Sequence, residues 1–465
     1  MNSGTRTVFA FFSFITLLAF NSVAQAQACG SGNGATVCLS ATGSSSNIAL
    51  TWTVSGTITA IEVYRDTDSN PTGRVRQASL AATARSFTDS TAVTGTPYWY
   101  WIKFRANGTF FNSGAATATR GGGSSSSSSS GGGGSPVGFG RAVTGGAGGA
   151  VVTVHTGAEF NSALCARASV TTPLIIRVDG TINHGNTTRA TGSCDTTATE
   201  IQFKGVSNVS LIGVANRGVL DQIGVHLRNT SNIVIQNLHI LNVKKSGSPI
   251  SNGGDAIGME STVNNVWVDH NTLEASGGES AGFDSLLDMK AGVTNVTVSW
   301  NHYFNSSRAG LIGSSDDDAA NTNITFHHNW YDRIQQRTPL LRHGLAHSYN
   351  NYWFNLSNSD MIHGINSRMG GRILVEGNYF KNSNNPLIAS DDSPQPGCWQ
   401  TRSNTLDSIS YDRSVGDGAL VVPVIINGQF DSTCTVTVPY SYTLDSSANI
   451  PGIVSNGAGF GRISP

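Results

Sequence analysis

The chain has 465 residues, and its 28 Lys and Arg residues nearly balance its 29 Asp and Glu residues, which gives a formal net charge of −1 at pH 7. This balance excludes a positive field over the whole molecule, so recognition of nucleic acid is not expected and recognition of any acidic polymer must be local. Only 12% of the residues are charged, and the abundant Gly, Asn, Ser and Thr are typical of an exported all-β protein.

Residues 1–26 predict a secretory signal peptide. Arg6 precedes the apolar run Val8–Phe20, and the small-residue pattern Ala24-Gln25-Ala26 follows. Lipid attachment at Cys29 is the alternative, although the residues before it lack the aliphatic residue that such sites usually have. No later stretch approaches the roughly 20 apolar residues that a spanning helix needs. We therefore expect a secreted monomer without a membrane partner.

Residues 29–120 predict a small β-sandwich, because short segments of alternating residues recur in them. These segments are Ile48–Val54, Ala60–Tyr64 and Tyr98–Phe104. The stretch from Phe87 to Tyr100 resembles the penultimate strand region of a fibronectin type III domain.

Trp99 and Trp101 alternate with Tyr98 and Tyr100 in the last of these segments. They could form an exposed surface that binds a plant cell-wall polysaccharide, or they could pack in the core of the sandwich and at its edge. Alternating aromatic residues on one strand are more often packed.

Residues 121–135 contain only Gly and Ser, a composition that cannot bury a core and predicts a flexible linker between two modules. The six cysteines form three couples that are close in the sequence, and an even count in an exported protein favours disulfides. The couples are Cys29 with Cys38, Cys165 with Cys194, and Cys398 with Cys434.

The second module, residues 136–465, repeats itself. A short apolar strand with an Asn near its start recurs at intervals of about 24 to 33 residues, and such self-similarity indicates stacked β coils. The recurring residues are Asn208, Asn232, Asn265, Asn295 and Asn323. A second series recurs in phase with the strands and predicts an asparagine ladder along the stack. This series is Asn271, Asn301, Asn329, Asn351 and Asn378.

Three places in the repeats carry residues that stacking does not need. They are Asp255, the pair Asp284 and Asp288, and the segment Arg337–Arg342. Three carboxylates that converge from consecutive coils would repel one another unless a cation lies among them, and oxygen ligands alone favour Ca²⁺. The alternative, three solvated loop aspartates, agrees equally well with the spacing.

These residues resemble the pectate lyase superfamily from about Val137 to the C-terminus. The resemblance rests on Val266-Trp267-Val268-Asp269-His270-Asn271, on the Asp-x-x-x-Asp-x-Lys pattern at 284–290, and on Arg337-x-Pro-x-x-Arg342. It implies a right-handed parallel β-helix and Ca²⁺-dependent β-elimination of α-1,4-linked polygalacturonate to 4,5-unsaturated products.

The resemblance also implies roles for individual residues. Asp255, Asp284 and Asp288 would bind Ca²⁺, Arg337 would take the proton, and the substrate would be bound by Arg308, Arg342 and Lys290. Two positions depart from the family pattern. Gly253 stands where another calcium-ligating Asp is frequent, and Arg308 stands where a substrate-binding Lys is frequent.

Three other functions remain as alternatives. A pectin lyase acting on methyl-esterified pectin would be expected to replace a calcium carboxylate with a cation, whereas Asp288 is retained. A hydrolase would need paired carboxylates, which Asp284 and Asp288 could supply. A non-catalytic polysaccharide-binding solenoid would leave Arg337 and Arg342 without a purpose. Asp269 and His270 could form a base, but at the end of a repeated strand we expect them to have a structural role.

Overall fold

The computed structural model describes residues 28–43, 47–67, 72–93, 96–120, 135–389, 392–412, 414 and 420–463. The chain divides into two compact units, residues 1–128 and 129–465. The predicted signal peptide and residues 121–134 of the predicted linker lie outside the described residues. Among the described residues, no helix is long and apolar enough to cross a membrane.

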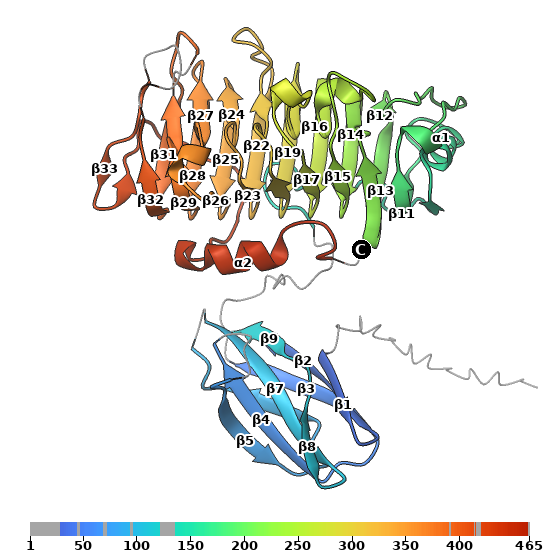
Figure 1. The fold of residues 1–465 in the computed structure, drawn as a ribbon, viewed down its shortest axis with the longest axis vertical. Helices are drawn as coiled ribbons and strands as arrows, with labels where there is room; N and C mark the ends of the chain where they lie inside the picture. The colour runs from blue at the N-terminus through green and yellow to red at the C-terminus, as the bar shows by residue number, and fades with distance from the viewer. Residues whose placement is uncertain are drawn as a thin grey trace, which may run out of the picture. The chain divides into compact units, whose positions relative to one another are not determined.

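The first unit consists of two small antiparallel sheets, in the orders β1-β2-β3-β6 and β5-β4-β7-β8, with β9 paired to β7 (Figure 1). Its strands are β1 Ala28–Gly32, β2 Ala35–Gly43, β3 Ile48–Ser55, β4 Ala60–Asp66, β5 Val75–Leu80, β6 Ser86–Asp89, β7 Pro97–Ala106, β8 Thr109–Asn112 and β9 Ala116–Thr119. The three strands that the sequence predicted are present as β3, β4 and β7.

Alternation along β7 decides which aromatic residues enter the core of the first unit. Tyr100 and Phe104 are fully buried in that core, because alternate residues of a strand point to opposite faces. Trp101 lies on the other face but is only 4% exposed, with the Arg74 guanidinium 5.5 Å from its ring. Trp101 is therefore packed and does not form an exposed sugar-binding surface, which agrees with the packing alternative. Trp99 is half-buried.

The second unit is a right-handed parallel β-helix in which each full coil contributes strands to three parallel ladders (Figure 1). Ladder 1 contains β12 Ile201–Lys204, the first halves of β14 Val225–Gln236 and β16 Ile257–Asp269, β18 Leu287–Lys290, β21 Leu311–Ile312, β24 Leu340–Arg342, β27 Ile365–Arg368 and β30 Leu387–Ala389.

Ladders 2 and 3 complete the coils. Ladder 2 contains β10 Ala150–Val154, β11 Leu174–Ile182, β13 Ser207–Asp221, the second halves of β14 and β16, β19 Val293–Ser299, β22 Thr322–His327, β25 Leu345–Tyr349, β28 Arg372–Glu376 and β31 Cys398–Arg402. Ladder 3 contains the ends of β11 and β13, β15 His239–Leu241, β17 Thr272–Glu274, β20 His302–Phe304, β23 Trp330–Asp332, β26 Tyr352–Phe354, β29 Tyr379–Asn384 and β32 Thr405–Ser410.

The predicted repeat is confirmed by the register of ladder 2. Val209, Ile233, Val266, Val296 and Ile324 are successive partners in it, and all five are fully buried. One repeat contains three strands rather than the single strand that the apolar pattern showed, because the strands of ladders 1 and 3 are too short to give a periodic signal.

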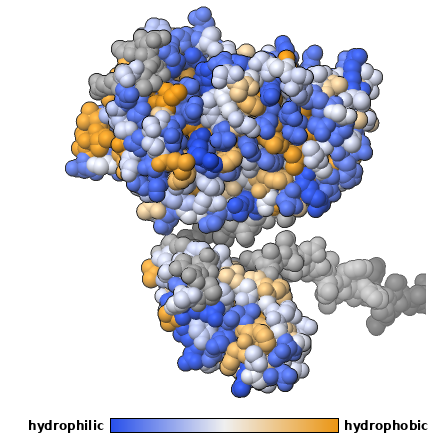
Figure 2. All heavy atoms as spheres, in the orientation of Figure 1, coloured by the Kyte–Doolittle hydropathy of each residue, from blue (hydrophilic) through white to orange (hydrophobic). Residues whose placement is uncertain are grey.

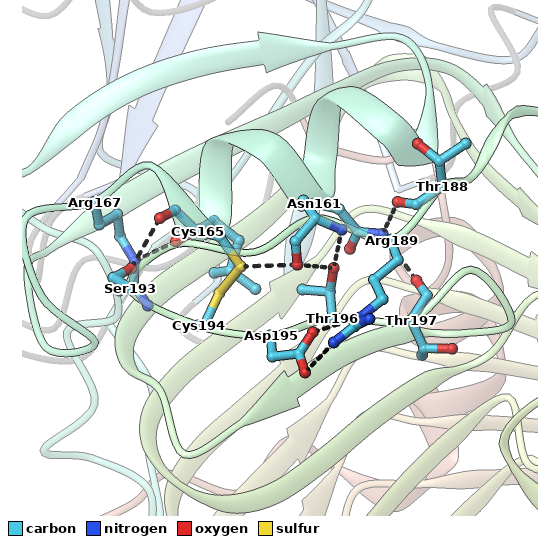
Figure 3. Close-up of a disulfide and its surroundings, with 12 residues drawn as sticks. Asn161, Cys165, Arg167, Thr188, Arg189, Ser193, Cys194, Asp195, Thr196 and Thr197 are labelled. Carbon is cyan, nitrogen blue, oxygen red and sulfur yellow. Dashed lines mark hydrogen bonds and ion pairs between the residues drawn. A yellow bond between two sulfur atoms is a disulfide. The ribbon is translucent and has the colours of Figure 1, made fainter.

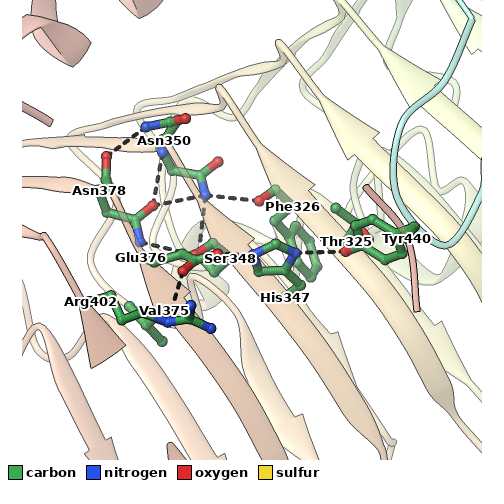
Figure 4. A network of polar contacts seen from close by, with 12 residues as sticks. Thr325, Phe326, His347, Ser348, Asn350, Val375, Glu376, Asn378, Arg402 and Tyr440 are labelled. Atoms are coloured by element: carbon green, nitrogen blue, oxygen red, sulfur yellow. Dashed lines mark hydrogen bonds and ion pairs between the residues drawn. The ribbon is translucent and has the colours of Figure 1, made fainter. Parts of the chain in front are cut away.

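The predicted asparagine ladder is also confirmed. Each side-chain amide donates to the Oδ1 atom of the next Asn at 2.9–3.2 Å, from Asn271 through Asn301, Asn329, Asn351 and Asn378. The ladder continues one coil further, to Asn404. Figure 4 shows part of it at Asn378. Buried polar groups with partners of this kind hold the register of the stack.

The first end of the solenoid is covered by helix α1 Gly157–Cys165. All three predicted disulfides form, and Cys165–Cys194 ties the end of α1 to the loop before β12. Asn161 on the same helix donates to the carbonyls of Thr188 and Thr197 in that loop (Figure 3). The cap thereby covers the apolar end of the stack.

The C-terminal segment crosses the outside of the stack. Helix α2 Ile450–Gly457 packs Ile450 and Val454 against Tyr352 of ladder 3 (Figure 1). The remaining short elements are η1 His184–Asn186, η2 Asn252–Gly254, η3 Glu279–Ala281, η4 Asn358–Asp360, η5 Ser447–Asn449, β33 Ile425–Ile426 and β34 Gln429–Phe430. Figure 2 shows a hydrophobic patch at the β33 end, where Ile425 and Ile426 are exposed.

Candidate active site

The seven site residues predicted from the sequence all lie on ladder 1 or in the loops that enter it. Asp255, Asp284, Arg308 and Arg337 precede β16, β18, β21 and β24, and Asp288, Lys290 and Arg342 lie within β18 and β24. Because the strands are stacked in register, four consecutive coils bring these residues to one side of the solenoid.

Asp255, Asp288 and Lys290 form the inner part of the site. In β18, Leu287 and Met289 point into the core, so Asp288 and Lys290 share the opposite face. The Lys290 ammonium lies 3.1 Å from Asp255 Oδ2 and 2.9 Å from Asp288 Oδ2. Asp288 Oδ1 also accepts the backbone N–H of Leu311 at 3.1 Å.

Both carboxylates of the inner part are buried, since Asp255 is 3% and Asp288 2% exposed. Burial first, and the charge of Asp288 second, raise the pKa of Asp255 well above its usual range. Burial favours the neutral amine of Lys290, but the charges of Asp288 and Asp255 outweigh it and raise the pKa of Lys290. Two buried carboxylates that lie close together need a nearby cation to remain ionised at the same time.

Asp284 belongs to an outer ion-pair network. Arg308 Nη1 donates to Asp284 Oδ1 at 2.8 Å, and Arg308 Nη2 donates to Glu279 Oε2 at 2.6 Å. Lys245 pairs with Glu279 and lies 3.7 Å from Asp284 Oδ1. Hydrogen bonds from Lys245 and then Arg308 lower the pKa of Glu279 to about 2, so this carboxylate is ionised at neutral pH.

Arg337 is half-buried beside the carboxylates. Its Nε is buried and has no hydrogen-bond partner among the described residues. Burial first, and the charge of Arg308 second, lower the pKa of Arg337, whereas Asp288 and Asp284 act in the opposite direction. Its backbone has a φ of 62°, a left-handed conformation that is unfavourable for a residue with a Cβ.

Arg342 lies at the end of β24, with its side chain held toward a neighbouring loop. Its Nε donates to Asp316 Oδ1 at 2.9 Å, and its Nη1 donates to the Gly313 carbonyl at 3.0 Å. Ser393 donates to the same Asp316 oxygen. These contacts orient the guanidinium before any ligand is bound.

The structure therefore brings the predicted residues together and excludes the alternative of solvated loop aspartates for Asp255 and Asp288. It also adds Glu279, Lys245 and Asp316, which the sequence analysis missed. None of the three belongs to a recognisable motif. Their contacts are to residues 26 to 34 positions away, so only the stacking of coils identifies them.

Among the described residues, no group of three or more His, Cys, Asp or Glu side chains is arranged as a metal-binding cluster. Lys290 and Arg308 lie among the three aspartates instead. The donor set nevertheless fits a hard cation, because it consists of carboxylate oxygens only. Asp255 Oδ1 is in addition buried, with no hydrogen-bond partner in the part of the chain that the structure describes.

Asp269 and His270 have the structural role that their position predicted. Asp269 is the last residue of β16, in ladder 2, His270 follows it, and both are buried. Asp269 accepts hydrogen bonds from Gln236 at 2.8 Å and Ser299 at 2.6 Å and pairs with His270 Nδ1 at 2.6 Å. This network joins three consecutive coils and uses the hydrogen-bonding capacity of the carboxylate.

A family model described as pectate lyase matches residues 112–463 of the chain. The chain is 39% identical over 325 residues to a pectate trisaccharide-lyase of Bacillus licheniformis, an alignment that covers 69% of this chain and 84% of the relative.

Two solved structures are similar to the second unit. One is a pectate lyase from Bacillus sp. N165 in complex with trigalacturonate, with a TM-score of 0.57, 29% identity and coverage of 70% of this chain and 99% of that chain. The other is pectate lyase C from Erwinia chrysanthemi, determined with Ca²⁺, with a TM-score of 0.56, 26% identity and coverage of 69% and 95%.

Proposed function

The chain belongs to the pectate lyase family and acts as a lyase on polygalacturonate, and we propose that it does so by Ca²⁺-dependent β-elimination at the site on ladder 1. The observation that carries the proposal is the meeting of three aspartates from consecutive coils with a half-buried arginine. A hydrolase would use two carboxylates as acid and base, whereas here Lys290 and Arg308 neutralise them.

We assign the Ca²⁺ ligands to Asp255, Asp284 and Asp288. Bound there, the ion would neutralise the carboxylate of the reacting uronate and so acidify its α-proton. The unpartnered Asp255 Oδ1 and the all-oxygen donor set support this assignment. Gly253 adds no ligand, and there is open space around the position that its Cβ would take.

Arg337 is the proposed base. A guanidinium in water is a poor base because its pKa exceeds about 12. In the site, burial and the charge of Arg308 lower that pKa, and no hydrogen bond from the described residues holds the proton on the buried Nε. Both effects favour transient loss of a proton to solvent water, and the neutral guanidine can then accept the α-proton of the uronate.

Arg308, Arg342 and Lys290 are the proposed substrate-binding cations. Arginine can bind a carboxylate through two parallel N–H donors, which fixes the orientation of a uronate as well as attracting it. Arg342 is already oriented by Asp316 and Gly313. In the family pattern a Lys often stands at the position of Arg308, so the positive charge is retained here.

The proposal is tested by incubating the enzyme with polygalacturonate and following the ultraviolet absorbance of the conjugated 4,5-unsaturated product. We expect the absorbance to increase in the presence of Ca²⁺. The increase should stop when a chelator is added and resume when Ca²⁺ is restored in excess. Hydrolysis would release reducing ends without absorbance, and full activity in excess chelator would remove the calcium assignment. Preference for methyl-esterified pectin would favour the pectin lyase alternative, which the similarity to pectate lyases does not support.

A second proposal concerns the first unit, for which we propose a contact with an acidic wall polysaccharide. Lys and Arg outnumber Asp and Glu in residues 29–120. On the outer face of its larger sheet, Lys103 lies 4.7 Å and Arg105 5.6 Å from the ring of Phe110. Cations beside aromatic rings can contact both the carboxylate and the sugar face of a polyuronate. We further propose that the protein is exported, as the N-terminal sequence predicted.

A further inference from the structure

Lys290 occupies the place between the two buried carboxylates to which the proposed function assigns Ca²⁺. Its Nζ is 3.1 Å from Asp255 Oδ2 and 2.9 Å from Asp288 Oδ2. Calcium–oxygen distances are roughly 2.3–2.6 Å. An ion that took these same two oxygens from the side of the ammonium would need the space that the ammonium fills, so we expect Ca²⁺ to compete with Lys290 for them.

The arrangement follows from the local fold. Residues two apart on a strand share a face, which places the Lys290 side chain beside Asp288 on β18, while the stacking of coils brings Asp255 to the same point. The Lys290 side chain is 29% exposed, so its flexible stem can turn outward without crossing the core. A departing ammonium would therefore move toward solvent.

We propose that Lys290 competes with Ca²⁺: its ammonium pairs with Asp255 and Asp288 in the metal-free enzyme and is released toward the substrate when the ion binds. The inference rests on the proposed calcium site. Since the released ammonium is then free to pair with a uronate carboxylate, calcium and substrate each favour the displacement of Lys290. Their binding is therefore coupled, and by linkage each raises the affinity of the enzyme for the other.

Gly253 strengthens this competition. With Gly253, one ammonium faces the two inner carboxylates, which leaves one unit of negative charge; a carboxylate at this position would leave two. The smaller residual charge attracts Ca²⁺ less strongly. We therefore expect weak binding of Ca²⁺ to the enzyme alone.

The test measures Ca²⁺ binding to the full-length, calcium-free protein by titration calorimetry, without substrate. The variants are Lys290→Met, which keeps most of the unbranched side chain and removes the charge, and Lys290→Arg, which keeps a cation. The matched control is Lys245→Met, because Lys245 pairs with Glu279 and lies near Asp284. We expect Lys290→Met to bind Ca²⁺ on the order of tenfold more tightly than the wild type, and Lys290→Arg and Lys245→Met to show no such gain.

A second titration in the presence of digalacturonate measures the coupling. Digalacturonate is expected to raise the Ca²⁺ affinity of the wild type more than that of Lys290→Met, in which the competitor is absent. If Lys290→Met does not fold without metal, Ca²⁺ should restore its circular dichroism spectrum, and failure to do so contradicts the inference.

Equal Ca²⁺ affinities of the wild type and Lys290→Met would overturn the competition and leave the calcium site standing. An equal gain in Lys245→Met would also overturn it, because the effect would then be one of general charge. If none of the proteins binds Ca²⁺, even with digalacturonate, the proposed calcium site itself is wrong.

Discussion

Arg337 and Arg342 differ in their surroundings although they belong to one short motif. Arg337 is half-buried with a free Nε, whereas the Arg342 guanidinium is held by Asp316 and Gly313. A guanidinium with an unpartnered nitrogen can change its protonation or contacts during a reaction. One that is already oriented is better suited to bind a carboxylate.

Arg337→Lys is therefore expected to lower kcat by about 10²- to 10⁴-fold, the range typical of a lost general base. Substrate affinity should change little, because lysine keeps the charge but moves the nitrogen. Arg342→Lys should instead raise KM, because a two-donor contact becomes a point charge. The measurement is steady-state kinetics on polygalacturonate, with direct binding of an oligogalacturonate.

Thermal unfolding serves as the control, since both side chains are partly buried. A near-normal kcat with a raised KM in Arg337→Lys would reverse the two roles and make Arg337 a substrate-binding residue. The base would then have to be sought among the other residues of the site.

At the scale of elements, the C-terminal segment is fastened to ladder 2 by a buried polar cluster. The His347 ring contacts Glu376 Oε1 at 3.0 Å through Nε2 and Tyr440 Oη at 2.7 Å through Nδ1 (Figure 4). Tyr440 also bonds to Thr325 at 2.8 Å, and Arg402 pairs with the second oxygen of Glu376. A neutral imidazole that donates at one nitrogen and accepts at the other satisfies both partners.

This cluster predicts a loss of stability in mild acid. Burial lowers the pKa of His347 although Glu376 opposes the shift, and burial followed by the charge of His328 lowers that of His327 well below its usual range. The unfolded chain takes up protons near the ordinary histidine pKa of about 6.5, before the folded chain does. The free energy of unfolding should therefore fall as the pH decreases from about 7 to about 5.

Denaturant unfolding across this pH range checks the prediction. His347→Gln retains a donor for Glu376 and does not titrate, so its stability should decline less with acid than that of the wild type. Burial raises the pKa of Glu376, but the hydrogen bonds with His347 and Tyr442 outweigh burial, so its pKa is lowered. A wild-type stability that stays level between these pH values would contradict the assignment of neutral, buried histidines.

At the scale of the whole molecule, each unit has its own core. The first unit buries residues such as Leu39, Leu50 and Phe104 within its two sheets. The second buries a continuous column that runs from Val154 to Phe430. A unit with a core of its own can fold without its neighbour.

Removal of residues 29–120 should therefore leave turnover of soluble polygalacturonate within about twofold, because a Gly/Ser linker transmits no fixed geometry. If the first unit holds wall polymer, the same deletion should lower activity on intact cell walls through lost effective concentration. Circular dichroism establishes that the shortened protein is folded. Loss of soluble-substrate turnover in a folded fragment would show that the units act together.

The sequence by itself determined the periodic features of this protein. Val209 and Ile233 recur in phase with a coil because each must fill the same position in the core, and Asn301 and Asn329 recur because each bonds the next. The cysteine couples and the family motifs are equally local in the sequence. Periodic and local constraints can be read from residue order, since every repeat expresses the same physical requirement.

The tertiary structure alone decided which charges meet. Lys290 between Asp255 and Asp288, and Glu279 beside Arg308, depend on side chains from different coils. Each of these contacts occurs once, so no repeated pattern in the sequence predicts it. Burial of Asp255 and the free Nε of Arg337 likewise depend on packing around them. Ion-pair geometry and pKa follow from distance and burial, which residue order does not contain.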